Sequence, residues 1–460
     1  MLRRAIKVVL LFALRVFFRR VEVVGRERVP REGACLFVLN HPNALVDPAL
    51  LLCHAPRRVS FLAKSPLFRT PVIGFFVRAL DSIPVYRRQD EGGDTSSRNR
   101  ETFERAAALL RRGGTIAICP EGASHSEPYL LPLKSGAARI ALGAVSAGGG
   151  GALDLKIVPA GLYYTAKATF RSGALLYFGE PIHVEPVEPA PDGEPPREAV
   201  RALSARVAEA MRALTLNADR HEALQMVARA ERIFSSADEG EDEARSLERE
   251  LRRRRRFVEA YAFHRRHSPA RLGVLEGRIT AYEEELRQAG LEDPRQLSPS
   301  TVAAYARVRR LLARVALFVV LLPFALLGAA LHYPAYTLAG ILATRFAREY
   351  DDVLSTFKIA AALLLFPLTW GLLAFALYGW AGWWGVVATL ALAPLTGFVA
   401  LRTREEFGRF VAGTRAALFF IRERSFFRRL LEERRRIRRE LLDLGDEYER
   451  AAAAHTEARG

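Results

Sequence analysis

The chain has 460 residues, enough for two or three domains, and its first ~190 residues can bury a full α/β core. It combines a formal net charge of +17 with 50% hydrophobic residues. This combination favours an anionic membrane surface as partner over nucleic acid, because nucleic acid explains only the charge. The cysteines Cys35, Cys53 and Cys119 have the spacing neither of a disulfide framework nor of a zinc site, so we expect a reducing compartment and no metal.

Residues 1–20, MLRRAIKVVLLFALRVFFRR, predict an amphipathic helix that anchors the chain in a membrane interface. Most basic side chains of this helix lie outside its apolar face. The apolar face comprises Ile6, Val9, Leu10, Ala13, Leu14, Phe17 and Phe18. Arg15 interrupts the apolar run and no small-residue cleavage site follows, which argues against a secretory signal. The alternative is an N-terminal helix that packs on its own domain.

Residues 21–185 alternate short β-rich runs with helical ones, which predicts an α/β domain with a mixed sheet flanked by helices. The expected strands are 34–39, 58–63, 83–86, 115–119, 156–164 and 173–179, and the expected helices include 100–112 and 136–147. Residues 186–197 are rich in Pro and Glu and can hold neither a helix nor a central strand. We therefore expect a linker there, at a domain boundary.

Residues 198–310 are rich in Ala, Arg, Glu and Leu, which predicts an all-α charged region. Its run Arg252–Arg256 is typical of a solvated helix face, with a membrane-surface or nucleic-acid patch as the alternatives. The region shows no sustained heptad, so the oligomeric state stays open. The apolar residues 311–347 are expected to form interfacial or re-entrant helices, bent at Pro323 and Pro334.

Residues 358–401 contain two apolar runs, each about the length of a bilayer core, separated by GWAGWW. This pattern predicts a membrane-spanning helical hairpin with tryptophans at the interface. Lys358 precedes the hairpin and Arg402 follows it, so the positive-inside rule places both ends, and with them the α/β domain, on the cytoplasmic face. A buried helical hairpin of a soluble protein is the alternative, and residues 402–460 predict a basic helical tail.

Residues with reactive side chains occur in four motifs of the α/β domain. In chain order these are Asn40-His41-Pro42-Asn43-Ala44-Leu45-Val46-Asp47-Pro48, the run 63–88 with Ile83-Pro84-Val85-Tyr86-Arg87, the turn Pro120-Glu121-Gly122 followed by Lys134 and Gly136, and Ile157-Val158-Pro159-Ala160. An ordinary buried strand ends in neither an imidazole nor a carboxylate. A His and an Asp at the end of a strand are the usual components of a general base and the group that orients it.

In order and spacing, the four motifs resemble those of the glycerolipid acyltransferases that share an H-x4-D motif, over residues 21–180. The later run 331–370 resembles the yeast-type glycerol-3-phosphate and dihydroxyacetone-phosphate acyltransferases more loosely. The resemblance implies an N-terminal acyltransferase domain and an O-acyltransferase activity in phospholipid synthesis. It also implies no cofactor, with an acyl-CoA or acyl-carrier-protein thioester as co-substrate.

The chain departs from the family pattern at two places. Five residues rather than four separate His41 from Asp47, a spacing that the yeast-type branch shares. Six positions on an ideal helix would rotate these side chains apart, so Pro42 and Asn43 must form a turn before the helix begins. The second departure is Asp81, where the second motif of the family usually has Gly.

The reaction suggests a role for each motif residue. Transfer from a thioester needs a hydroxyl that loses its proton as it attacks, so His41 is the expected base and Asp47 the group that fixes its tautomer. No enzyme nucleophile is required, and Cys119 in an apolar strand is expected to be a packed thiol. Candidate substrate-binding residues are Arg87 and Lys134 for an acceptor phosphate, Glu121 for an acceptor hydroxyl, Gly122 for close backbone approach, and Asn43 for an oxyanion.

Several of these assignments have alternatives. Asn43 is expected rather to cap the following helix. Arg87 could be a surface residue with Arg88 in its place, and His125 could belong to the site or to an ordinary turn.

We therefore expect a membrane-bound acyltransferase that transfers a fatty acyl group to a hydroxyl of glycerol 3-phosphate or dihydroxyacetone phosphate. The same chemistry on lysophosphatidate or another lysophospholipid is the first alternative. A catalytically silent membrane adaptor is the second, although it would have no need for the complete set of motif residues. Nucleic-acid binding, suggested by the charge alone, comes last.

Overall fold

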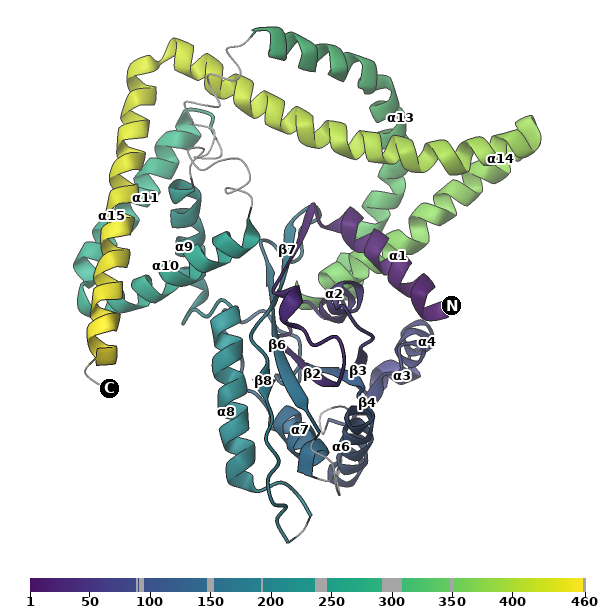
Figure 1. Cartoon of the computed structure of the whole chain (residues 1–460). Helices are drawn as coiled ribbons and strands as arrows, with labels where there is room; N and C mark the ends of the chain where they lie inside the picture. Colours follow the sequence, from purple (N-terminus) through teal and green to yellow (C-terminus); the bar gives the residue numbers. More distant parts are fainter. Residues whose placement is uncertain are drawn as a thin grey trace. The chain divides into compact units, whose positions relative to one another are not determined.

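The computed structural model describes residues 1–87, 90, 95–146, 153–191, 193–235, 246–291, 308–347 and 351–457. The chain forms two compact units (Figure 1). The first comprises Met1–Asn217 and Ala347–Ile359, and the second comprises Ala218–Phe346 and Ala360–Gly460.

A mixed sheet forms the centre of the first unit, as the sequence predicts. Its strands are β1 Arg20–Val24, β2 Ala34–Leu39, β3 Ser60–Lys64, β4 Ile83–Val85, β5 Thr115–Ile118, β6 Leu155–Tyr164, β7 Gly173–Phe178 and β8 Ile182–His183. Their order is β1-β7-β6-β2-β5-β3-β4, with β8 beside β6. Strand β6 runs antiparallel to β7 and β8, and the other neighbours are parallel. Strand β2 has the predicted bounds, whereas β1 and β8 were not among the predicted strands.

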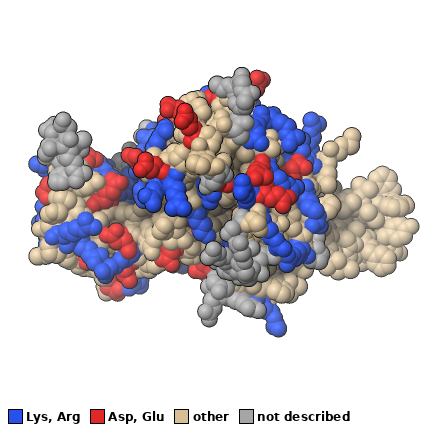
Figure 2. Space-filling view, turned by 90° about the horizontal axis from the view of Figure 1, so that it is seen from below, with Lys and Arg blue, Asp and Glu red and all other residues tan. Residues whose placement is uncertain are grey.

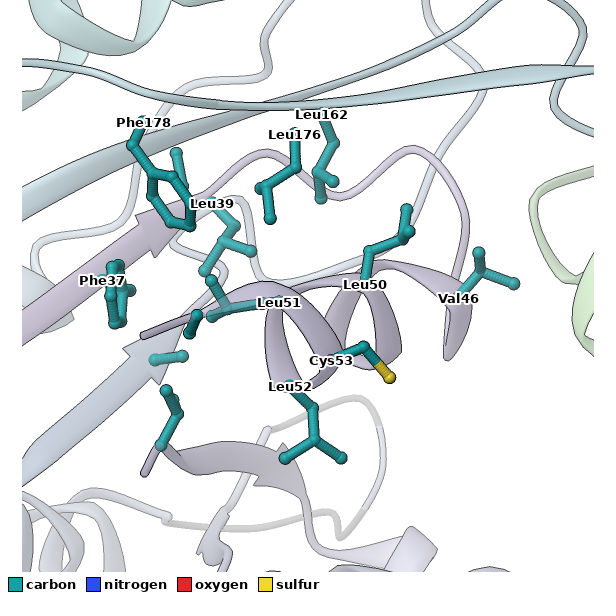
Figure 3. Close-up of a cluster of buried hydrophobic side chains, with 14 of the residues drawn as sticks. Phe37, Leu39, Val46, Leu50, Leu51, Leu52, Cys53, Leu162, Leu176 and Phe178 are labelled. Carbon is teal, nitrogen blue, oxygen red and sulfur yellow. The ribbon is translucent and has the colours of Figure 1, made fainter. Parts of the chain in front are cut away.

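Helices cover both faces of this sheet. They are α1 Leu2–Phe17, α2 Val46–His54, α3 Pro66–Arg69, α4 Pro71–Ala79, α6 Ser96–Arg111, α7 Gly136–Ser146 and α8 Arg197–Leu214. Alternate residues of β2 point to opposite faces, and all six are buried. Phe37 and Leu39 pack with Leu50 and Leu51 of α2 (Figure 3), while Leu36 and Val38 belong to the core under α6, α7 and α8. Burial on both faces fixes β2 rigidly, and the residues that follow it inherit that position.

Helix α1 packs on its own domain along one face and leaves other apolar side chains exposed. Its buried side chains include Leu14 and Phe17, and it contacts α2 and α4. The exposed ones are Leu2, Val8, Val9 and Phe12, and Phe75 and Phe76 of α4 are also exposed. The structure therefore shows the packed N-terminal helix, together with uncovered apolar surface beside it.

The first unit extends past the boundary expected near residue 185. Helix α8 lies within the region 198–310 expected to be a separate helical region, but it packs on β6 and α7. Its apolar stripe Val200, Leu203, Val207 and Met211 is buried in the core of the α/β domain. The Pro-rich stretch 186–197 thus connects two elements of one unit.

The second unit contains a helical bundle and two long apolar helices. The bundle comprises α9 His221–Phe234, α10 Leu247–His267, α11 Pro269–Gln288 and α15 Arg424–Glu457, which contact one another. In the arginine run, Arg253 and Arg254 pair with the buried Glu231, and Arg256 pairs with Asp446 of α15. These arginines therefore take part in ion pairs within the bundle rather than forming an unpaired basic face.

The two apolar helices are α13 Val308–Ala347 and α14 Asp351–Arg422. Segments Val315–Ala347 and Asp351–Gly408 are long and apolar enough to cross a membrane. Helix α13 continues through both of its prolines, where the sequence suggested separate bent helices. Helix α14 is broken at Gly382, inside the predicted GWAGWW turn, by a backbone with φ 55° and ψ −145°. In Figure 2 the part of α14 around this break shows only uncharged side chains, and Trp380, Trp383 and Trp384 there are highly exposed.

Candidate active site

The predicted base and its partner meet at the carboxyl end of β2. His41 Nδ1 lies 2.9 Å from Asp47 Oδ2. Helix α2 begins at Val46, and the residues before it form a turn in which Ala44 has a φ of 34°. The left-handed residue absorbs the additional position of the H-x5-D spacing. The turn expected from the sequence therefore brings the two side chains together.

Asp47 is fully buried, and its carboxylate accepts three hydrogen bonds. Oδ2 accepts from the Asn43 backbone N–H at 2.7 Å as well as facing His41, and Oδ1 accepts from the Tyr164 hydroxyl at 2.5 Å. A buried carboxylate is stable only when hydrogen bonds replace its water, and these three do so. They also hold Asp47 in one orientation relative to the imidazole.

Asn43 does not cap α2, whose N-cap residue is Leu45. The fully buried Asn43 side chain donates from Nδ2 to the Lys167 carbonyl at 3.4 Å. Its Oδ1 has no hydrogen-bond partner among the described residues. Asn43 therefore links its own loop to the loop that follows β6, instead of capping α2 as the sequence predicted.

A second buried carboxylate holds the backbone of His41. Glu121 follows β5, whose parallel pairing with β2 brings both carboxyl ends to one edge of the sheet. Glu121 Oε1 accepts from the His41 backbone N–H at 2.8 Å, and Oε2 accepts from Leu131 N at 2.9 Å and faces His125 Nε2 at 2.5 Å. His125 N donates in turn to the His41 carbonyl at 3.1 Å. His125 therefore belongs to the site, and Glu121 orients the loop of the base.

The candidate phosphate ligands lie around Gly122. Gly122 has a φ of 78°, and a Cβ added there would overlap the end of the Lys134 side chain. Arg87 Nη1 donates to the Gly122 carbonyl at 2.8 Å, and its Nε and Nη2 bind the carboxylate of Asp90 at 2.6 and 2.9 Å. Two cations, Arg87 and Lys134, thus lie at this turn together with the carboxylates of Asp90 and Glu121. Arg88 lies outside the described residues.

Sequence reasoning missed Tyr164 and Lys167, which lie at and beyond the end of β6. Lys167 Nζ donates to the Pro42 carbonyl at 3.0 Å, the His125 carbonyl at 3.3 Å and Ser126 Oγ at 2.7 Å. It therefore joins the loop of His41 to the loop after Glu121. The sequence gives no signal for this position, because it depends on the pairing of β6 with β2, which brings the end of β6 beside this loop.

The electrostatics of the site favour a protonated imidazole and a neutral phenol. Burial alone lowers the pKa of His41, but the adjacent ionisable Cys119 and the hydrogen bond to Asp47 outweigh it and raise the pKa well above its ordinary value. Burial and the Asp47 carboxylate raise the pKa of Tyr164, which stays a hydrogen-bond donor. Burial lowers the pKa of Lys167, against the attraction of Asp352 and Asp47. The His41 side chain is 21% exposed, so a substrate can reach its ring.

Among the described residues, no group of three or more His, Cys, Asp or Glu side chains could hold a metal ion. Each of the seven residues proposed from the sequence contacts another part of this site: His41, Asn43, Asp47, Arg87, Glu121, Gly122 and Lys134.

Comparison with known proteins gives two family matches. The family model described as Acyltransferase matches residues 20–163, and the one described as glycerol-3-phosphate acyltransferase 2 C-terminal domain matches residues 237–450. The two matches agree with the glycerolipid acyltransferase family that the sequence motifs resemble. The first match contains the residues from His41 to Lys134, and the second contains the apolar helices α13 and α14.

Two yeast proteins are similar over much of the chain. The Saccharomyces cerevisiae glycerol-3-phosphate O-acyltransferase 2 is 29% identical over 59% of this chain and 37% of its own length. The glycerol-3-phosphate O-acyltransferase 1 of the same yeast is 26% identical over 76% of this chain and 58% of its own length. The chain thus spans less than two thirds of either relative. A crystal structure of the Thermotoga maritima 1-acyl-sn-glycerophosphate acyltransferase aligns with 46% of this chain and 79% of its own, at 22% identity and a TM-score of 0.33.

Proposed function

We propose that this protein transfers a fatty acyl group from an acyl-CoA or acyl-carrier-protein thioester to a hydroxyl of glycerol 3-phosphate or dihydroxyacetone phosphate. The observation that carries the proposal is the His41–Asp47 pair, whose imidazole ring is partly exposed. Arg87 and Lys134 lie at the turn that follows β5. The two yeast relatives, whose names specify glycerol 3-phosphate, support this acceptor class.

The pair performs the proton transfers of the reaction. With the Nδ1 proton donated to Asp47, Nε2 is the nitrogen of the neutral His41 ring that can accept a proton, and the Cys119 side chain lies within hydrogen-bonding reach of this ring. The acceptor hydroxyl gives its proton to Nε2 as its oxygen attacks the thioester carbonyl carbon, and Asp47 stabilises the imidazolium that forms. When the carbon–sulfur bond breaks, the leaving thiolate takes the proton back from His41. The ester and the free thiol are then complete, and the enzyme returns to its starting state.

The turn around Gly122 binds the acceptor phosphate in this proposal. Arg87 and Lys134 supply fixed positive charge, and Arg87 is held in place by Asp90 and by the Gly122 carbonyl. Glu121 already accepts three hydrogen bonds from the chain, so its contribution is to orient His41. This arrangement favours a small phosphorylated acceptor near the ring of the base.

We also propose that the enzyme is bound to an anionic membrane with its α/β unit on the cytoplasmic face. Helices α13 and α14 have the length and apolarity to cross a bilayer, and Trp380, Trp383 and Trp384 are exposed as interfacial tryptophans are. The exposed apolar side chains of α1 and α4 give the α/β unit its own surface for the interface. Membrane attachment would place the site where the acylated product partitions.

The test uses full-length protein purified in detergent, with release of free thiol from palmitoyl-CoA or palmitoyl-acyl-carrier protein as the signal. Glycerol 3-phosphate, dihydroxyacetone phosphate and lysophosphatidate are offered separately. His41→Ala is expected to lose at least about 10³-fold in rate, since it removes the base and its proton relay. The matched control His183→Ala changes an exposed histidine on β8 and is expected to retain wild-type rates.

Turnover on one of the first two acceptors that is lost only in His41→Ala supports the proposal. Turnover confined to lysophosphatidate would replace the proposed acceptor class while retaining the chemistry. Absence of turnover with every acceptor and both donors, from folded protein, would contradict the proposed activity.

A further inference from the structure

The beginning of α14 belongs to the same compact unit as His41, although most of α14 belongs to the other. We call residues Asp352–Lys358, its first two turns after Asp351, the α14 start. Its residue Ser355 contacts the carbonyl of Lys167, from which it is 188 positions away along the chain. Ile359, directly after it, packs against the core cluster that contains α2.

The α14 start contacts both loops that carry the buried carboxylates and the base. Thr356 Oγ1 accepts from the Leu45 backbone N–H at 3.2 Å, in the turn between His41 and α2. Ser124, in the loop after Glu121, donates its hydroxyl to the Asp352 carboxylate. One helical segment thus touches the two chain segments that meet at the His41 ring.

The same segment also holds the loop that follows β6. Ser355 donates its hydroxyl to the Lys167 carbonyl, and Lys358 Nζ donates to the Ala168 carbonyl at 2.7 Å. Lys167 is the residue whose ammonium joins the His41 loop to the loop after Glu121. By fixing its backbone, the α14 start controls where that ammonium lies.

Burial indicates that these contacts are part of a packed structure. Asp352 is 7% exposed and Ser355 is fully buried. A buried carboxylate requires a hydrogen bond and a compensating charge. Ser124 supplies the first, and the Lys167 ammonium, which Asp352 attracts, supplies the second. Removing the Asp352 carboxylate would take away the acceptor of the Ser124 hydroxyl and a negative charge that attracts Lys167.

We propose that the α14 start is a positioning element of the acyltransferase site, which keeps the His41 loop, the loop after Glu121 and the loop after β6 in their reactive arrangement. The inference rests on the proposed function. It makes the site incomplete within residues 20–163, because a segment from the range of the second family match closes it. It also makes the geometry of the base dependent on the fold of the helix that continues into the apolar segment of α14.

The experiment measures kcat and KM for the acceptor in full-length variants of the α14 start. Thr356→Val keeps the side-chain volume and removes the acceptor for Leu45 N–H, whereas Thr356→Ser restores a hydroxyl. Thr369→Val is the matched control on the same helix, since the Thr369 hydroxyl bonds only to the preceding turn, at the Leu365 carbonyl, among the described residues. Asp352→Asn is compared with Glu104→Gln, which neutralises an exposed carboxylate on α6.

We expect Thr356→Val and Asp352→Asn to lower kcat by about 10- to 100-fold, because a small displacement of the base costs that much in rate. Acceptor KM should stay within about threefold, since the phosphate-binding turn is not altered. Thr356→Ser should recover most of kcat, and both control variants should match wild type. Folding is followed in parallel by the melting temperature.

The outcomes separate the inference from the function on which it rests. If wild type is inactive on every acceptor, the proposed function fails. If wild type is active and His41→Ala is not, but Thr356→Val and Asp352→Asn both keep wild-type kcat, the positioning role is refuted. A rate loss matched by an equal loss of folded protein, with kcat per folded molecule unchanged, refutes it as well.

Discussion

Replacing Asp47 by Asn tests how the base is oriented. All three partners of the carboxylate are donors in the structure: His41 Nδ1–H, Asn43 N–H and the Tyr164 hydroxyl. An amide has one acceptor oxygen and one donor group, so one partner must face the NH2. The Asn43 backbone can only donate, whereas a phenol hydroxyl can also accept. The amide oxygen is therefore expected to keep the position facing His41, with its NH2 toward Tyr164.

In this orientation the variant keeps the tautomer of His41 and loses only the charge beside it. A hydrogen bond to a charged group is worth about 1–1.5 kcal/mol more than one between neutral groups. We therefore expect kcat to fall by about 5- to 15-fold. Inversion of the tautomer would instead cost about 10⁴-fold, the size of loss known for a serine-protease triad. The acidic limb of the pH–rate profile should also move to lower pH, because Asp47 helps to raise the pKa of His41.

The assay is the initial rate of thiol release as a function of pH for wild type, Asp47→Asn, and Asp47→Asn combined with Tyr164→Phe. The double variant removes the hydroxyl that accepts from the amide, so its orientation is no longer fixed and the rate should fall further. An unchanged rate in Asp47→Asn would show that the pair takes no part in transfer. A loss near 10⁴-fold in the single variant would refute the argument from Tyr164.

Five further results are expected. Wild-type kcat/KM should rise with pH through a midpoint above the ordinary histidine value of about 6.5, because the pKa of His41 is raised and only the neutral ring accepts a proton; a midpoint below this value would contradict the assignment. The raised pKa of His41 also stabilises the folded protein. This stabilisation is fully present below the pKa of His41 in the unfolded chain and is lost as pH rises through its pKa in the folded protein. Denaturant titrations at several pH values would measure the trend. Gly122→Ala should raise acceptor KM and lower stability by about 1–2 kcal/mol, because an L-residue is strained at φ 78° and its Cβ displaces Lys134. Cys119→Ala should keep kcat within about threefold, since direct transfer needs no thiol, whereas loss of turnover together with trapping of an acylated Cys119 in wild type would show a covalent route. Arg87→Met should raise KM for glycerol 3-phosphate far more than KM for the thioester, and equal effects on both would argue against phosphate binding.

The parts of the fold that the sequence predicted are those set by local pattern. Six consecutive apolar residues, buried on both faces, define β2 from Ala34 to Leu39, and both of its ends were predicted correctly. The motif residues after β2 and β5 were predicted to act together because the motifs resemble those of the acyltransferases. The structure supplies the physical reason, since the parallel pairing of these strands brings their carboxyl ends to one edge. Strand β8 has only two residues, too few to show a hydrophobic alternation.

Contacts that depend on distant pairing could not be predicted in this way. Tyr164 and Lys167 reach the site because β6 pairs with β2 in a register that places Ala160 beside Leu39. No local pattern gives that register. Asp352 and Thr356 are further still, in a stretch that resembles the beginning of an apolar helix and gives no sign of contact with Ser124 or Leu45. Helix α8 was assigned to a separate helical region because the Pro-rich stretch before it suggested a domain boundary. Its apolar stripe instead packs into the core of the α/β domain.

The reactive histidine is held from two sides by two buried carboxylates with different tasks. Asp47 binds the ring of His41 at Nδ1, and Glu121 binds its backbone N–H. The first carboxylate follows β2 in the chain and the second follows β5, so the parallel pairing of these strands sets the distance between them. Because the ring and the backbone are both fixed, Nε2 has one direction in which to accept a proton. In the proposed mechanism, the strand pairing of the fold, rather than any single side chain, therefore defines the direction from which an acceptor hydroxyl must approach.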